Sequence, residues 1–249
     1  MRNIAVILAG GIGARVGGNT PKQLLPLQDG KSVLEHAVDA FEQSPHIHEI
    51  CIVMHPDYIM HAEQMLLANA WQKVHHIIPG GKERWESSVQ AIRRLGERRE
   101  AIGKETNCQL PIANSHNAVN LLLHDAARPF VSQEIIARVC EALKEHEAVT
   151  VAIPSTDTVY EMVAGRVARI PQRSTIMRAQ TPQAFRLELI AEAYAKALGV
   201  DICDIQACSA CHLPATDDCG VLFNHMPKTP IHIVLGEEQN KKITFKEDI

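Results

Sequence analysis

Segments rich in aliphatic and β-branched residues alternate with segments of helical periodicity along most of the chain. In 33–41, for example, apolar side chains recur at a spacing that places them on one face of a helix. Strands that alternate with helices form βαβ units, which build a mostly parallel sheet covered by helices on both faces. The sequence therefore predicts a three-layer α/β fold. The expected strands are 4–9, 49–54, 74–78, 119–124, 148–153 and 231–235, and the expected helices are 33–41, 58–71, 86–99, 133–145 and 187–198.

Two regions interrupt this alternation. The polar stretch 98–117 contains scattered Gly, Pro, Asn and Ser residues and is expected to be an exposed insertion. The strand-like runs 158–163 and 166–170 flank Ala164 and Gly165, which predicts a β-hairpin within an arm at about 155–178. A hairpin that projects from a parallel sheet is suited to dimerisation. The absence of a low-complexity linker or repeat favours a single domain, 1–249.

Composition excludes several classes of partner. The formal net charge of -4 provides no global positive field that would attract nucleic acid or anionic lipid. The longest apolar run, 4–9, is far shorter than the roughly 20 residues of a membrane-spanning helix. The N-terminus leads directly into a predicted strand, so we expect a cytoplasmic protein with no nucleic-acid or membrane partner. Any anion that the protein binds must be held locally.

The first predicted strand leads into a glycine-rich segment. Residues 9–18 read AGGIGARVGG, and Pro-Lys-Gln follows at 21–23. The unobstructed N–H groups of such a loop can wrap a phosphate chain at the carboxyl end of a strand. Arg15 and Lys22 add positive charge. The spacing fits neither the dinucleotide fingerprint nor the Walker pattern, and the glycines alone are also typical of a structural turn.

Three further motifs follow in order: GGKERWES at 80–87, HDAARP at 124–129 and QTPQAF at 180–185. With the glycine-rich segment, they resemble the 2-C-methyl-D-erythritol 4-phosphate cytidylyltransferase family. The ribitol-5-phosphate cytidylyltransferases are a near relative that shares most of the pattern. The resemblance implies a Rossmann-like nucleotidyltransferase fold. It also implies that CTP and a polyol phosphate react to give a CDP-alcohol and pyrophosphate.

In this reaction a substrate phosphate oxygen attacks the α-phosphorus of CTP in line, and no covalent enzyme intermediate is needed. By the resemblance, Arg15 and Lys22 are the catalytic pair that holds the α-phosphate and the leaving group. The resemblance also implies Mg²⁺ or another divalent cation, bound mostly through phosphates and water, with Asp125 as its protein contact. The residues expected to bind the nucleotide are Ala9, Gly10, Gly11, Gly13, Gly80, Ser87 and Asp125.

The expected acceptor-binding residues are Arg128, Thr158, Arg173, Thr181 and Lys242. The resemblance places Thr158 and Arg173 on the arm, where they reach the neighbouring subunit's site, and so implies a homodimer. An Asp125–Arg128 pair that merely shapes a turn is the structural alternative. Lys82 stands where methylerythritol enzymes often carry Asp, which leaves base recognition, and the choice between methylerythritol and ribitol phosphate, open.

Two other patterns have structural explanations. Cys208, Cys211 and His212, with Cys203 and Cys219 nearby, show the spacing of haem attachment and loosely that of a zinc site. We expect neither group and interpret these cysteines as fortuitous. Residues 216–218 (TDD) match a family segment near the site, or form a helix N-cap with an acidic first turn. A catalytically silent nucleotide-binding regulator on the same fold is the alternative function.

Overall fold

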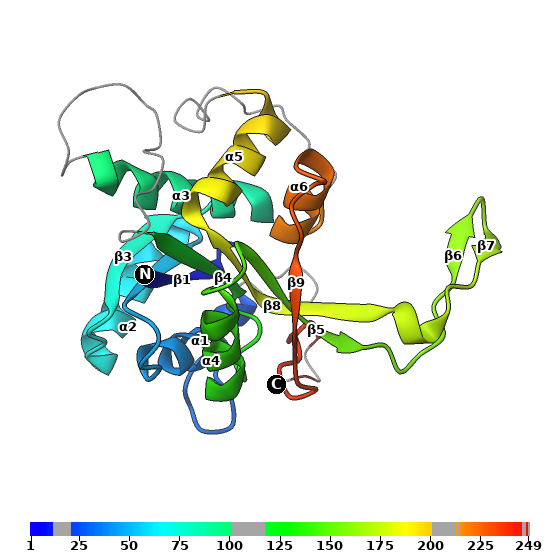
Figure 1. Ribbon diagram of the computed structural model, residues 1–249. Coiled ribbons are helices and arrows are strands. Elements are labelled where there is room, and N and C mark those ends of the chain that lie inside the picture. Colours follow the sequence, from blue (N-terminus) through cyan, green and yellow to red (C-terminus); the bar gives the residue numbers. More distant parts are fainter. Residues whose placement is uncertain (12–20, 101–117, 201–212, 214, 246–247, 249) are drawn as a thin grey trace.

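The computed structural model describes residues 1–11, 21–100, 118–200, 213, 215–245 and 248, with the backbone alone for 97–100. A seven-stranded sheet crosses the molecule (Figure 1), and only β8 runs antiparallel to its neighbours. The mostly parallel α/β fold is thus confirmed. In sheet order, the strands are β3 (Val74–Pro79), β2 (Glu49–Met54), β1 (Arg2–Ala9), β4 (Val119–Asp125), β8 (Met177–Arg186), β5 (Ala148–Pro154) and β9 (His232–Leu235).

Helices cover both faces of the sheet, as Figure 1 shows. Alternate side chains of β1 point to opposite faces: Ile4, Val6 and Leu8 pack on one side, while Ala5 and Ile7 pack on the other. The predicted three layers follow from this alternation. One face carries α3 (Arg84–Glu100), α5 (Leu187–Leu198) and α6 (Asp218–His225), and the other carries α1 (Val33–Glu42), α2 (Ile59–Asn69) and α4 (Gln133–Ala142). Among the described helices, none combines the length and the hydropathy required to cross a bilayer.

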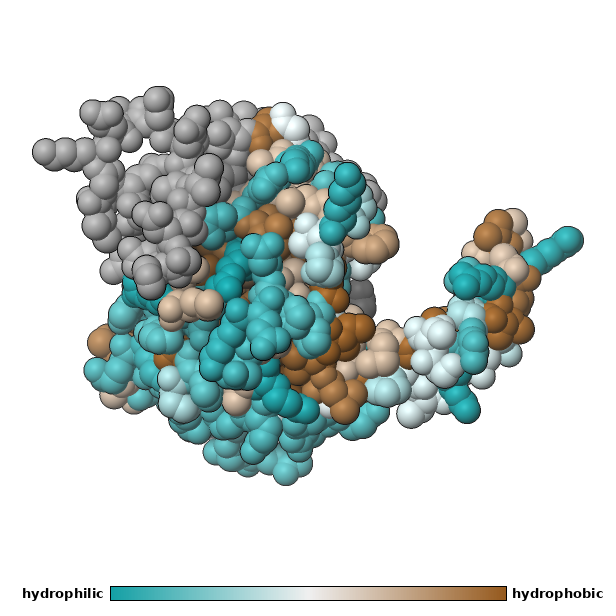
Figure 2. Space-filling model, viewed as in Figure 1, coloured by the Kyte–Doolittle hydropathy of each residue, from teal (hydrophilic) through white to brown (hydrophobic). Residues whose placement is uncertain are grey.

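The chain between β5 and β8, residues 155–176, forms an arm that projects away from the sheet (Figure 1). At its tip, β6 (Glu161–Val163) and β7 (Arg166–Arg169) pair antiparallel, so the predicted hairpin is confirmed with shorter strands. Ala164 and Gly165 both have positive φ, 49° and 75°, as a tight hairpin turn requires. Every residue of the two strands is exposed, and Figure 2 shows apolar side chains on this arm.

The expected elements omitted β8, which inserts between β4 and β5. Gln183 pairs with both neighbours, but the register then shifts so that Val151 pairs with Gln180. Thr181 and Pro182 therefore form a bulge, a feature that redirects side chains at functional sites. A second difference concerns 98–117: α3 continues to Glu100, and 101–117 lie outside the described residues.

Candidate active site

A cavity of about 640 Å³ opens where β1, β3 and β4 end. Open α/β sheets bind ligands at this edge, because the loops that follow parallel strands meet there. Its walls come from four segments far apart in the sequence. They are Leu8 to Gly11 with Lys22 and Gln23, Gly81 to Arg84 with Ser87, Asp125 to Ala127, and Lys242 with Thr244.

The two glycine-containing loops meet at this edge through backbone contact. A Cβ atom on either Gly10 or Gly80 would lie 2.8 Å from the Ser87 hydroxyl oxygen, so a side chain at either position would displace Ser87. That oxygen in turn accepts a hydrogen bond from the Gly81 N–H at 3.2 Å. Glycine is thus required at both positions so that the loops can approach each other. Ser87 lines the cavity with Gly10, whereas Gly80 lies behind the wall.

Gln23 fixes the start of the glycine-rich loop. Its side-chain amide donates to the Ala9 and Gly11 carbonyl oxygens, at 2.7 and 2.8 Å. Sequence reasoning gave this buried residue no role, although it belongs to the quoted Pro-Lys-Gln triplet. Expected nucleotide-binding residue Gly13 lies outside the described residues.

Lys22 begins the 3₁₀ turn η1 (Lys22–Leu24) and lines the cavity. Its ammonium group donates to the main-chain carbonyl of Ile243 at 2.8 Å, so the C-terminal segment helps to hold it. Its expected partner, Arg15, lies outside the described residues. The structure therefore places one member of the expected catalytic pair.

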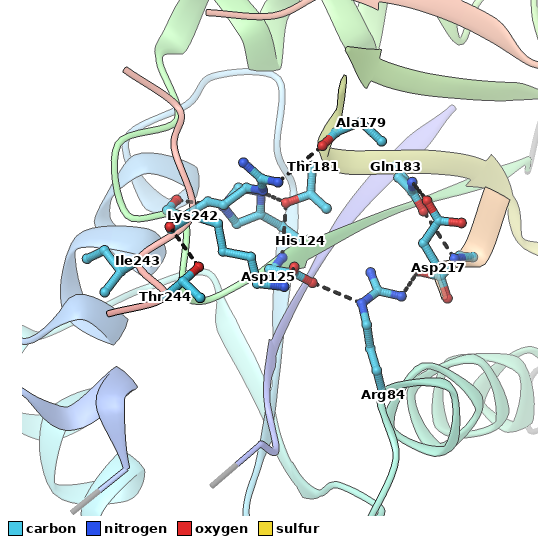
Figure 3. A network of polar contacts seen from close by, with 12 residues as sticks. Arg84, His124, Asp125, Ala179, Thr181, Gln183, Asp217, Lys242, Ile243 and Thr244 are labelled. Carbon is cyan, nitrogen blue, oxygen red and sulfur yellow. Dashed lines mark hydrogen bonds and ion pairs between the residues drawn. The ribbon is translucent and has the colours of Figure 1, made fainter. Parts of the chain in front are cut away.

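A row of alternating charges lies along the cavity wall (Figure 3). Asp125 receives Arg84 Nε at 3.0 Å on one carboxylate oxygen and Lys242 Nζ at 2.7 Å on the other. Arg84 also donates to Asp218 at 2.6 Å through Nη1. Burial raises the pKa of Asp125, but the positive charges of Arg84 and Lys242 lower it by more. The pKa therefore lies far below its usual range. Asp125 is therefore a carboxylate at any physiological pH.

Sequence reasoning missed Arg84, although the residue belongs to the quoted GGKERWES motif. One feature of the sequence could have indicated its role: Arg84 lies in the first turn of a helix, directly after a loop at the ligand-binding edge of the sheet.

The two interpretations of 216–218 both hold. Asp217 caps α6 by accepting from the Gly220 N–H at 2.7 Å, and Asp218 reaches Arg84.

Thr181 supports Asp125 from behind the cavity. Its hydroxyl accepts from the Asp125 N–H at 3.1 Å and donates to Nδ1 of His124 at 3.0 Å. The His124 Nε2 atom faces the Arg128 carbonyl oxygen at 2.9 Å and must therefore carry the proton. Burial lowers the pKa of His124 to about 4, so the ring is neutral. In this structure the buried Thr181 acts on the backbone around Asp125, and its expected acceptor contact stays a prediction.

The remaining expected acceptor residues occupy different places. Lys242 lines the cavity and lies outside any strand. Lys241 is more exposed and pairs with Asp248. Arg128 is outside the cavity wall and donates to the carbonyl oxygens of Asn240 and Ala179.

Thr158 and Arg173 lie on the arm and are exposed. The guanidinium of Arg173 is near the Thr156 carbonyl oxygen, within the arm itself. The structure does not bring these two residues into the cavity of their own chain. A role for them there would require another subunit.

The donor set gives little support for a protein-held metal. Each oxygen of Asp125 already faces a cation, and the described part of the chain contains no group of three or more His, Cys, Asp or Glu residues that could hold a metal ion. These residues alone do not fit a divalent cation, which would depend on phosphate and water ligands.

Of the four clustered cysteines, only Cys219 is described, and burial raises the pKa of its thiol. The other three lie outside the described residues.

Comparisons with known proteins agree with this geometry. The family model of 2-C-methyl-D-erythritol 4-phosphate cytidylyltransferase matches residues 3–103 and 109–249, and the unmatched gap falls within the expected insertion. The enzyme of that name from Thermobifida fusca (strain YX) is 39% identical, with alignment over 100% of this chain and 90% of that protein. The one from Bifidobacterium longum (strain DJO10A) is 35% identical over 99% of this chain and 77% of that protein.

A third relative is the bifunctional ribulose 5-phosphate reductase/CDP-ribitol pyrophosphorylase of Haemophilus influenzae. It is 33% identical over 100% of this chain, which spans 47% of that protein. Among solved structures, a 4-diphosphocytidyl-2C-methyl-D-erythritol synthase matches with a TM-score of 0.71 and 25% identity, over 99% of this chain and 94% of that one. The chain belongs to the 2-C-methyl-D-erythritol 4-phosphate cytidylyltransferase family.

Proposed function

We propose that this cavity transfers a cytidylyl group from CTP to 2-C-methyl-D-erythritol 4-phosphate and releases pyrophosphate, the family's step in isoprenoid precursor synthesis. The observation that carries the proposal is the meeting of two kinds of group in one cavity. The glycine-rich loop and Lys22 form one wall, and the Asp125–Lys242 pair forms another. Two phosphorylated substrates need this combination of N–H donors and fixed cations.

The nucleotide lies, in this proposal, against the loop that contains Ala9, Gly10 and Gly11. Main-chain N–H groups of such a loop can bind the triphosphate. Lys22, with Arg15, stabilises the charge that develops as pyrophosphate leaves. The loop around Gly80, with Ser87, receives the base and ribose, and Asp125 accepts hydroxyl hydrogen bonds.

The acceptor phosphate binds Lys242, beside the place taken by the nucleotide. Arg128 and Thr181 support the wall that the Asp125–Lys242 pair forms. Attack on the α-phosphorus then needs only that the two anions be held in line, so positioning is the chain's main contribution. Mg²⁺ stays a prediction, in which it neutralises the triphosphate through phosphate and water ligands. The cytoplasmic location also stays a prediction.

A homodimer is part of the proposal, and the arm supports it. Its exposed apolar side chains include Met162, Val163, Val167 and Ile170, which are 71%, 67%, 55% and 60% exposed. An isolated two-stranded hairpin is marginally stable in water, and a contiguous apolar patch marks an interaction surface. In a dimer, Thr158 and Arg173 on this arm would complete the partner's acceptor site.

The test is pyrophosphate release from CTP with 2-C-methyl-D-erythritol 4-phosphate or ribitol 5-phosphate as acceptor. We expect a kcat/KM about tenfold or more higher for the methylerythritol compound. The relative named for CDP-ribitol makes the second acceptor the appropriate competitor. Preference for ribitol 5-phosphate would assign the alternative activity, and no release with either would indicate a catalytically silent protein.

A further inference from the structure

Arg84 lies between two carboxylates at the cavity wall, and the reaction outlined above gives it no role. Nε donates to Asp125 at 3.0 Å (Figure 3), and Nη1 donates to Asp218 at 2.6 Å. We propose that Arg84 is a positioning residue, which holds the Asp125 carboxylate at the cavity wall while Lys242 leaves that carboxylate for the acceptor phosphate. The inference rests on the proposed function for the identity of the acceptor.

Asp218, which pairs with Arg84 Nη1, is itself held firmly in place. The Asp218 side chain is 0% exposed and also receives the Tyr194 hydroxyl at 2.7 Å. The Asp218 N–H donates to the side chain of Gln183 at 3.1 Å. A buried carboxylate with this many partners has little freedom to move, so the guanidinium is fixed to α5, α6 and β8.

Lys242, at the other end of the row of charges, is the member that can move. The Lys242 side chain is 43% exposed, against 12% for Asp125. An ammonium on a flexible stem can change partners at low cost, whereas a guanidinium held at both ends cannot. A phosphate dianion that enters the cavity can therefore take Lys242 from Asp125.

The charges of the row explain why Arg84 is then needed. Asp218, Arg84, Asp125 and Lys242 together are neutral in the free protein. When Lys242 pairs with a phosphate, Asp125 keeps Arg84 as its counter-ion and does not have to follow Lys242. Its second oxygen becomes available to accept a substrate hydroxyl, at a position that Arg84 has already set.

The test separates positioning from stability by comparing a single variant with a double variant. Arg84→Gln leaves Asp218 buried without its cation, so the melting temperature is expected to fall. Adding Asp218→Asn removes that charge and should restore most of the loss. Arg94→Gln, an exposed residue of the same helix, controls for the loss of one arginine from α3.

The expected kcat/KM for the acceptor is about 10²-fold below wild type in both Arg84→Gln and the double variant, as for a misplaced catalytic group. Stability would thus return without activity. Recovery of kcat/KM together with the melting temperature, or full activity in Arg84→Gln, would show that Arg84 is only structural.

Crystal structures of wild type and the double variant, each soaked with inorganic phosphate, give a readout that needs no turnover. Where phosphate has drawn Lys242 away, we expect the Asp125 carboxylate to keep its place in wild type and to follow Lys242 in the variant. If wild type proves inactive on CTP but Asp125 moves in the variant, the proposed function fails and the positioning role stands. If wild type is active and Asp125 stays in place in an active variant, the positioning role fails.

Discussion

Lys22 is held in place by the chain itself. Its ammonium donates to the Ile243 carbonyl oxygen at 2.8 Å, at the wall of the cavity. A preorganised cation stabilises charge that develops in the transition state more than charge already present in bound CTP. Lys22→Ala should therefore lower kcat by about 10²-fold or more, with a smaller loss of CTP affinity. Pyrophosphate release and titration calorimetry measure the two quantities.

Lys31→Ala is the matched control. Lys31 is an exposed lysine whose ion pair with Asp39 lies away from the cavity, and surface pairs of this kind contribute little. Its kcat should stay at the wild-type value. An unchanged kcat in Lys22→Ala, with CTP affinity lowered as much as kcat/KM, would assign Lys22 to ground-state binding instead.

Individual site residues were predictable where they match the family resemblance. Gly10, Ser87, Asp125 and Lys242 were all expected on that ground, and all line the cavity. The role of Arg84 was not predictable, because its partner Asp218 is 134 residues away and the contact depends on how α6 packs. Sequence spacing carries no information about such a distant pairing.

Among the elements, strands with aliphatic sequences were the predictable ones. The bounds of β2 and α5 agree with those expected, since both have an uninterrupted apolar pattern. β8 was missed because Pro182 stands in its middle, and a proline argues against a central strand. The bulge accommodates the proline and directs Thr181 toward β4.

The junction of β4 and β8 should make stability depend on pH through His124. Burial lowers its pKa to about 4, against an ordinary value of 6.5, despite its hydrogen bonds to Arg128 and Thr181. Below about pH 6.5 the His124 ring therefore binds a proton in the unfolded chain, whereas in the native chain the ring stays neutral until the pH falls toward 4. Stability from this group is complete above that pH and falls toward pH 4, by about 3 kcal/mol in total.

Urea unfolding at several pH values in this window measures the effect. His124→Asn keeps one donor and one acceptor but does not titrate, so its unfolding free energy should depend less on pH. The charges nearest His124 are Asp125 and Arg128. Asp125 titrates below its ordinary value of 3.8 and contributes outside this window. Equal pH slopes for the two proteins would contradict the prediction.

For the whole molecule, the sequence predicted the arm. The strand-like runs on either side of Ala164 and Gly165 indicate a hairpin, and Met162 and Val167 on that hairpin are exposed in the single chain. The position of Arg173 on this arm, outside the cavity of its own chain, is what a shared site would require.

Shared sites predict complementation between inactive chains. In a heterodimer of Lys22→Ala and Arg173→Ala chains, one cavity has its own Lys22 and receives an intact Arg173 from the partner. Random mixing should therefore restore about a quarter of the wild-type activity. Lys22→Ala mixed with Lys242→Ala is the control, because both residues line the cavity of their own chain and neither heterodimer site is intact. Sedimentation should show a dimer throughout, and a fully active monomer, or equal recovery in the two mixtures, would contradict the exchange of arms.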